Sequence, residues 1–272
     1  MAFDPYPFPS YTWDYQGFDF AGMSGLDASL AQAMYDDGVR FVGRYLFGQQ
    51  YPNGKGLSAA EAQLYLNAGI SIFLYYEVNS NDALGGQARG EQLGQQALAQ
   101  AVALGVPQGT PIICCCDTGV TDAQANGVVM QFLQGFASQL PDYRIGIYGG
   151  ANVMQACYNL NPDYWRVQAG AWGADEFSDI NVRQWLIAKN SAAINDGYCR
   201  ISNITIRNGY AYWRGRNVDL ISAPTLVNMW GPGSSPTPPG PTPPPPPPVP
   251  PILDKSMPIW FYLKLYKGSD NQ

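Results

Sequence analysis

The stretch Ile72-Phe73-Leu74-Tyr75-Tyr76-Glu77 is an apolar run typical of a buried β-strand, and it ends on a single carboxylate. A second run, Ile112-Ile113-Cys114-Cys115-Cys116-Asp117, repeats the pattern, and Asp19 and Asp219 end two shorter runs. Taken singly, each acid is equally typical of a helix cap or a loop. Together they favour an active site, because strand ends converge on one face of a parallel barrel. The predicted catalytic residues are Glu77, Asp117, Asp19 and Asp219.

The sequence contains no histidine, so carboxylates, helped by tyrosine, are left to transfer protons near neutral pH. Ser-His-Asp and Cys-His catalysis and the usual zinc sites with histidine ligands are thereby excluded. The thiols of residues 114–116 alternate between strand faces and cannot converge on one metal ion. No GxGxxG or GxxxxGK[ST] motif is present, so we expect neither a cofactor nor a metal. Two carboxylates that flank a glycosidic bond fit what remains.

Charged residues make up 13% of the 272 residues, and the net charge is −6. Because nucleic-acid binding needs clustered lysine and arginine, we expect no nucleic-acid partner. The first residues lack the basic start and apolar core of a secretory signal, and no segment is apolar enough to span a bilayer. We therefore expect a chain made in the cytoplasm without a signal peptide and without membrane insertion.

Residues 16–230 are interpreted as the barrel domain. From about residue 17 to residue 223, short β-branched or aromatic runs alternate with stretches of helical period. Eight strands that alternate with helices predict an α/β fold, a (β/α)8 barrel of the TIM type. Residues 201–213 are predicted to form an inserted β-hairpin that turns at Asn208-Gly209. The predicted strands are 16–20, 41–46, 70–76, 111–116, 144–148, 165–169, 184–188 and 217–220. The predicted helices are 27–37, 58–67, 83–104, 121–140 and 151–158.

The rest of the chain differs in composition. Residues 1–15 are interpreted as an N-terminal arm. Residues 231–251 are more than half proline and predict an extended, semi-rigid linker. Residues 252–272 are rich in aromatic and basic side chains and are interpreted as a docking segment, with a disordered tail as the alternative.

Aromatic side chains near the predicted strand ends offer flat faces on which sugar rings stack, and neighbouring amides can bind sugar hydroxyls. Packing in the core or at the rim explains each ring equally well when it is taken alone. The predicted substrate-binding residues are Tyr45, Tyr76, Tyr148, Gln168 and Trp172.

Short motifs follow one another in a fixed order within residues 16–224. They are Gly17-Phe18-Asp19, Phe41-Val42-Gly43-Arg44-Tyr45, Tyr75-Tyr76-Glu77, Pro111-Ile112-Ile113, Ile147-Tyr148-Gly149 and Asn217-Val218-Asp219-Leu220. This ordered series resembles the glycoside-hydrolase-like domain family DUF1906, which is related to the GH25 lysozymes. The resemblance implies a barrel that acts on cell-wall glycan, with Asp19, Asp117 and Asp219 as acids at its mouth.

One departure from the related lysozymes concerns the fourth strand. The resemblance leads us to expect Asp-x-Glu there, with the glutamate as general acid, whereas Asp117 is followed by Thr118 and Gly119. Either Glu77 supplies the acid from the neighbouring strand, with Asp117 as base or electrostatic stabiliser, or activity is reduced or absent.

The order of barrel, proline spacer and aromatic segment also resembles that of a bacteriophage virion component. It implies a minor tail protein that contacts cell-envelope glycan of the peptidoglycan or arabinogalactan type, and other virion proteins through residues 252–272. Three hypotheses follow: a glycoside hydrolase, a glycan-binding module without catalysis, and a purely structural virion protein.

Overall fold

The computed structural model describes residues 13, 15–46, 55–170, 177–185 and 198–232. These residues all lie in one compact unit, Met1–Gly240. The predicted docking segment and nearly all of the predicted arm and linker fall outside the described residues. Within the described part of the chain, no helix combines the length and apolar character needed to cross a membrane.

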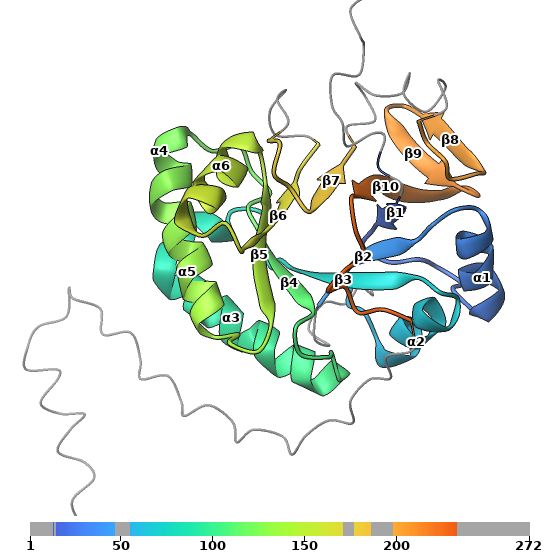
Figure 1. Cartoon of the computed structure of the whole chain (residues 1–272), viewed down its shortest axis with the longest axis horizontal. Helices are drawn as coiled ribbons and strands as arrows, with labels where there is room; N and C mark the ends of the chain where they lie inside the picture. Colours follow the sequence, from blue (N-terminus) through green and yellow to red (C-terminus); the bar gives the residue numbers. More distant parts are fainter. Residues whose placement is uncertain (1–12, 14, 47–54, 171–176, 186–197, 233–272) are drawn as a thin grey trace, which may run out of the picture. The chain divides into compact units, whose positions relative to one another are not determined.

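The described residues form ten strands, and eight of them close into a barrel (Figure 1). From β1 to β7 the strands run parallel, each paired with the next in chain order. β10 closes the ring between β7 and β1, and β8 and β9 extend from it as a hairpin. The strands are β1 (Tyr15–Asp19), β2 (Phe41–Tyr45), β3 (Ser71–Tyr76), β4 (Pro111–Cys115), β5 (Arg144–Gly149), β6 (Trp165–Gln168), β7 (Val182–Gln184), β8 (Ile204–Arg207), β9 (Tyr210–Trp213) and β10 (Arg216–Ala223).

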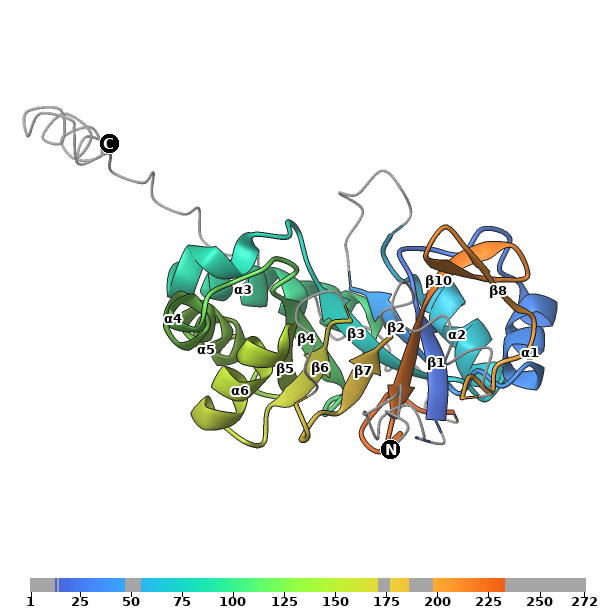
Figure 2. The same ribbon diagram turned by 90° about the horizontal axis from the view of Figure 1, so that it is seen from above.

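Helices cover the outside of the barrel in two groups: α1 and α2 lie beside β1 to β3, and α3 to α6 beside β4 to β6 (Figures 1 and 2). All five predicted helical segments are helical. The segment at 121–140 is divided by a π-helical turn, because the chain there makes wider backbone hydrogen bonds. The helices are α1 (Ala28–Asp36), α2 (Ala59–Asn67), η2 (Asp82–Gly85), α3 (Gly86–Leu104), α4 (Asp122–Gln124), η3 (Ala125–Val129), α5 (Met130–Ser138) and α6 (Ala151–Leu160).

The predicted α/β barrel of the TIM type is confirmed, but the direction of its last strand differs from that of the other seven. β10 is antiparallel to both β1 and β7. The inserted hairpin returns the chain at the mouth, so β10 begins there and runs back into the barrel. Asp219 therefore lies in the first half of β10 and not at its carboxyl end, where the sequence predicted it.

Alternate residues of the strands fill the barrel with aromatic rings. Phe41, Phe73, Tyr75 and Trp165 belong to one buried cluster inside the barrel. Gly43 makes room for them, because a Cβ there would come within 2.8 Å of the Phe73 ring and 2.7 Å of the Tyr75 ring. The small residue Gly43 therefore leaves the space that the large rings of Phe73 and Tyr75 fill inside the barrel.

The hairpin β8–β9 is anchored by Asp37, the residue that follows α1. The Asp37 carboxylate accepts hydrogen bonds from Asn203 Nδ2 (2.9 Å), Trp213 Nε1 (2.9 Å) and Arg214 Nε (2.8 Å). These bonds hold the pKa of Asp37 below its usual range, against the opposing effect of burial. The predicted hairpin and its turn at Asn208-Gly209 are confirmed, and one carboxylate holds the root.

Replacing Asp37 with alanine is expected to lower the free energy of unfolding by about 1–3 kcal/mol, because the buried indole N–H of Trp213 would lose its acceptor. Urea unfolding at neutral pH measures the change. Asp36→Ala, at the exposed neighbouring acid, is the matched control. An equal effect in both variants would contradict the anchor.

Candidate active site

One end of the barrel opens into a cavity of about 730 Å³. Its wall includes all four predicted catalytic acids and two of the predicted binding residues, Tyr45 and Tyr148. The other residues that line it are Phe20, Ala21, Gly22, Lys55, Tyr75, Cys115, Gly170, Gln184, Trp185, Asn208, Gly209, Tyr210 and Asn217. The sequence prediction that these acids share one mouth agrees with their positions.

Asp19 and Asp219 face each other across the β1–β10 pair, as direct partners in the antiparallel register. Burial raises the pKa of Asp19 well above its usual range, and the Asp219 charge raises it further. Burial also raises the pKa of Asp219, whereas its hydrogen bond with Asp19 opposes that rise. The two carboxyl groups are thus coupled, and their burial and mutual repulsion favour the retention of one proton by the pair.

Two neutral side chains, Tyr75 and Gln184, hold Asp19 in place by hydrogen bonds. The Tyr75 hydroxyl donates to Asp19 Oδ2 at 3.0 Å, and Gln184 Nε2 lies 3.3 Å from each carboxyl oxygen. Tyr148 fixes the amide in turn, because its hydroxyl donates to Gln184 Oε1 at 2.8 Å. The rings of Tyr75 and Tyr148 pack edge to face at 5.8 Å. This chain spans β5, β7, β1 and β3 and makes the floor of the cavity rigid.

Glu77 and Asp117 follow the ends of the adjacent strands β3 and β4 and line the same cavity. Burial raises the pKa of Glu77; Lys55 opposes this, and the Asp117 charge raises it further. Lys55 Nζ lies 3.8 Å from Glu77 Oε2 and 4.6 Å from the centre of the Tyr45 ring. A carboxyl group with a raised pKa therefore shares the cavity with a second acid, and a pair of this kind can serve acid–base catalysis.

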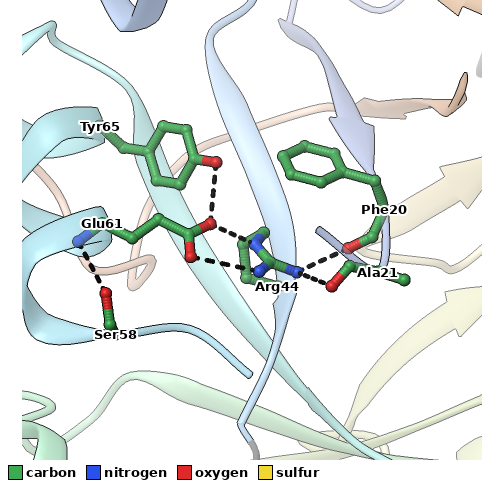
Figure 3. A network of polar contacts seen from close by, with 6 residues as sticks. All are labelled: Phe20, Ala21, Arg44, Ser58, Glu61 and Tyr65. Carbon is green, nitrogen blue, oxygen red and sulfur yellow. Dashed lines mark hydrogen bonds and ion pairs between the residues drawn. The ribbon is translucent and has the colours of Figure 1, made fainter. Parts of the chain in front are cut away.

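The segment after Asp19 is clamped by Arg44, whose side chain is fully buried (Figure 3). One guanidinium nitrogen donates to the carbonyls of Phe20 (2.6 Å) and Ala21 (3.1 Å), and Nε donates to Glu61 Oε1 at 2.7 Å. The Tyr65 hydroxyl donates to the same glutamate oxygen at 3.0 Å. Since Phe20 and Ala21 line the cavity, the clamp fixes one edge of it from outside the barrel.

Two of the predicted substrate-binding residues lie away from the cavity. Tyr76 is 1% exposed and points outward, where its hydroxyl donates to Gln96 of α3 at 3.0 Å. Gln168 is buried in β6, and its Oε1 accepts from the Phe177 N–H at 2.8 Å. The reason is the two-residue period of a strand, which sends neighbours to opposite faces. Trp172 lies outside the described residues.

Sequence reasoning missed several residues that the structure brings into the cavity. Tyr75 and Cys115 were detectable, because they stand two positions before Glu77 and Asp117 and therefore share their strand face. Lys55, Gln184 and Tyr210 carried no such signal. In the described part of the chain, no group of three or more acidic, cysteine or histidine side chains is arranged to hold a metal ion.

An eight-stranded α/β barrel with carboxyl groups gathered in a cavity at one end has the architecture of a glycoside-hydrolase-like protein. The chain belongs to the family described as Rv2525c-like, glycoside hydrolase-like domain, whose model matches residues 32–210. The resemblance inferred from the ordered motifs is confirmed at this level.

Solved structures share the fold. The Tat-secreted protein Rv2525c of Mycobacterium tuberculosis aligns with a TM-score of 0.59 and 19% identity, over 79% of this chain and 98% of that one. An uncharacterized B. stearothermophilus protein aligns with a TM-score of 0.52 and 17% identity, over 79% and 100%. The uncharacterized protein YbfG of Bacillus subtilis is 27% identical in an alignment 143 residues long that covers 47% of this chain and 19% of that protein. The chain thus matches about a fifth of this relative's length.

Replacing Asp19 with asparagine is expected to stabilise the protein at pH 7. Between about pH 3.9, the pKa of an unfolded aspartate, and the raised pKa of native Asp19, the folded state binds more protons, so stability falls as pH rises. Asparagine mimics the protonated acid, so the variant does not lose this stability. Its free energy of unfolding should exceed that of the wild type by on the order of 1 kcal/mol at pH 7, and the difference should vanish near pH 3. Thermal unfolding across this range, with exposed Asp163→Asn as control, measures it. A gain that does not depend on pH would contradict the assignment.

Arg44→Lys is expected to destabilise the protein by about 2–4 kcal/mol, because one ammonium group cannot replace a buried guanidinium that serves a carboxylate and two carbonyls. The amides of Ala21 and Gly22 should then exchange faster with solvent. Denaturant unfolding and hydrogen exchange measure both effects, with Arg144→Lys at an exposed arginine as control. Unchanged exchange at Ala21 would show that the clamp does not fix the rim.

Proposed function

We propose that this protein is a glycoside hydrolase that cleaves bacterial cell-envelope polysaccharide of the peptidoglycan or arabinogalactan type. The observation that carries the proposal is the placement of Glu77, a carboxyl group with a raised pKa, beside Asp117 in one cavity. Hydrolysis of a glycosidic bond needs one carboxyl group that is protonated and a second that is ionised. Family membership supports the same class of reaction.

In this proposal Glu77 donates a proton to the leaving oxygen, and Asp117 acts as the base or as the electrostatic stabiliser of the positive charge that develops on the sugar. The side chain of Glu77 is 11% exposed, so a substrate oxygen in the cavity can reach it. Lys55 limits the rise in its pKa and keeps the group able to release its proton.

The pair Asp19–Asp219 has a different part. Asp19, held by Tyr75 and Gln184, is a buried acid, and in this proposal it keeps the proton of the pair while Asp219 carries the negative charge. We assign Asp219 to binding a sugar hydroxyl or steadying the transition-state charge, with Asp19 as the residue that positions it. Tyr45 and Tyr148, which line the cavity, supply flat faces for the sugar.

A second candidate function is glycan recognition without cleavage. The observation in its favour is that Thr118 and Gly119 follow Asp117, so the strand-four acid expected from the lysozyme resemblance is missing. The cavity would then hold the sugar through the same rings and carboxylates.

The place of action is part of the proposal and rests on the sequence alone. The proline-rich residues 231–251 and the aromatic residues 252–272 support attachment to a larger assembly, which we propose is a phage tail. Under the third hypothesis, a structural virion protein, removal of residues 232–272 abolishes incorporation into particles, while changes at Glu77 leave infectivity intact.

The test compares sugar release from purified bacterial cell wall by the wild type, Glu77→Gln and Asp117→Asn, with Asp163→Asn as the surface control. Hydrolysis predicts that each active-site variant loses at least about a hundredfold in rate, the lower range for general acid–base catalysis. The rate should also fall as pH rises through the pKa of Glu77. Equal release by wild type and both variants would refute catalysis, and sedimentation with the wall without release would select the binding function.

A further inference from the structure

One wall of the cavity comes from outside the barrel. The tip of the β8–β9 hairpin contributes Asn208, Gly209 and Tyr210, and β10 contributes Asn217 beside it. Tyr210 keeps 58% of its surface exposed, although it lines the cavity. An aromatic ring held at a cavity wall and left open to solvent has the form of a stacking platform, because it packs no apolar core there.

The tip is held in a fixed shape. Asn208 and Gly209 adopt positive φ angles of 50° and 79°, as a two-residue hairpin turn requires. At the root, the fully buried Trp213 donates to Asp37 and packs against Phe18 of β1, with ring centroids 5.9 Å apart. A ligand that stacks on the tip would therefore meet a wall that is already ordered, which lowers the entropic cost of binding.

The segment after β1, which also lines the cavity, is fixed as well. The Arg44 clamp holds Phe20 and Ala21, and Arg216, the first residue of β10, donates to the Ser24 carbonyl at 3.4 Å. The hairpin and the segment after β1 are thus tied to each other and to the barrel. Both segments line the cavity that also contains the four acids.

The two ends of this cavity differ in charge. At the barrel end lie Asp19, Glu77, Asp117 and Asp219, with Lys55 as the cation among the described lining residues. The hairpin end presents a phenol ring and the amide side chains of Asn208 and Asn217. Amides bind hydroxyl and acetamido groups, and the excess of carboxyl groups disfavours a polyanion.

We propose that the hairpin tip is a second sugar subsite, in which Tyr210 stacks on one pyranose ring of an uncharged glycan chain while the adjoining sugar lies among the acids. This inference rests on the proposed function and narrows its substrate class to an uncharged oligosaccharide of at least two sugars. Asn208 and Asn217 would bond the hydroxyl or acetamido groups of the stacked ring.

The experiment measures binding of N-acetylglucosamine and its linear two-, three- and four-unit oligomers by calorimetry. Wild type and Glu77→Gln are both used, so that binding is read without turnover. We expect affinity to rise from one unit to three. Tyr210→Ala should weaken the longer oligomers about tenfold, a loss of the size seen for aromatic contacts, and should leave the monosaccharide unchanged. Tyr210→Phe and Tyr210→Trp, which keep a ring, should stay within about twofold of wild type.

Two controls make the outcome specific. Tyr158→Ala removes an exposed tyrosine that is not among the cavity residues and should change nothing. Oligogalacturonates of equal length test the charge assignment and should bind more weakly. Equal affinities for wild type and Tyr210→Ala, failure of every oligomer to bind, or equal binding of the galacturonates would each overturn the proposal. Loss of binding in Tyr210→Ala without any sugar release by wild type would keep the subsite and refute only hydrolysis.

Discussion

The pairing of Asp19 with Asp219 across the closing strand is the constraint on which the site depends. A barrel whose eighth strand ran parallel would bring two strand ends together, whereas the antiparallel β10 sets one acid directly opposite another. Two like charges in direct register repel, so a proton must be retained and neutral donors must surround the pair. Tyr75, Gln184 and Tyr148 meet this demand. The floor of the cavity is therefore a consequence of how the barrel closes.

The surrounding structure offsets the cost of that arrangement. Arg44 ties the segment after Asp19 to β2 and α2, and Asp37 ties the hairpin to the end of α1. In both places, one buried charged side chain forms hydrogen bonds with several backbone or side-chain groups. These bonds compensate each charge where it is desolvated. Through these clamps the segment Phe20–Ala21 and the β8–β9 hairpin, which both line the cavity, are held in place.

The barrel could be predicted from the sequence because the patterns that indicate its strands, helices and turns are local. Apolar runs, helix caps and the Asn208-Gly209 turn each depend on a few neighbouring residues, and the strands at residues 41–45 and 111–115 lie within the predicted ranges. The two-residue period of the strand also implied that Tyr76, the neighbour of Glu77, points away from the cavity. Its prediction as a substrate-binding residue did not take this period into account. Strand direction at Asp219, the contact of Lys55 with Glu77 and the position of the hairpin tip were not available. Each depends on contacts between segments far apart in the chain.

The different surroundings of the acids argue for two separate tasks in one cavity. Asp19 is buried, bonded on both oxygens and paired, so it is poorly placed to exchange a proton with a substrate. Glu77 also has a raised pKa, yet its partner is a partly exposed lysine 3.8 Å away, which a substrate group can displace. A group that must give and regain a proton in each cycle needs this looser environment, because a fixed hydrogen-bond network would oppose every change of charge. Under the proposed function, the deep pair would hold the sugar and the outer pair would act on it.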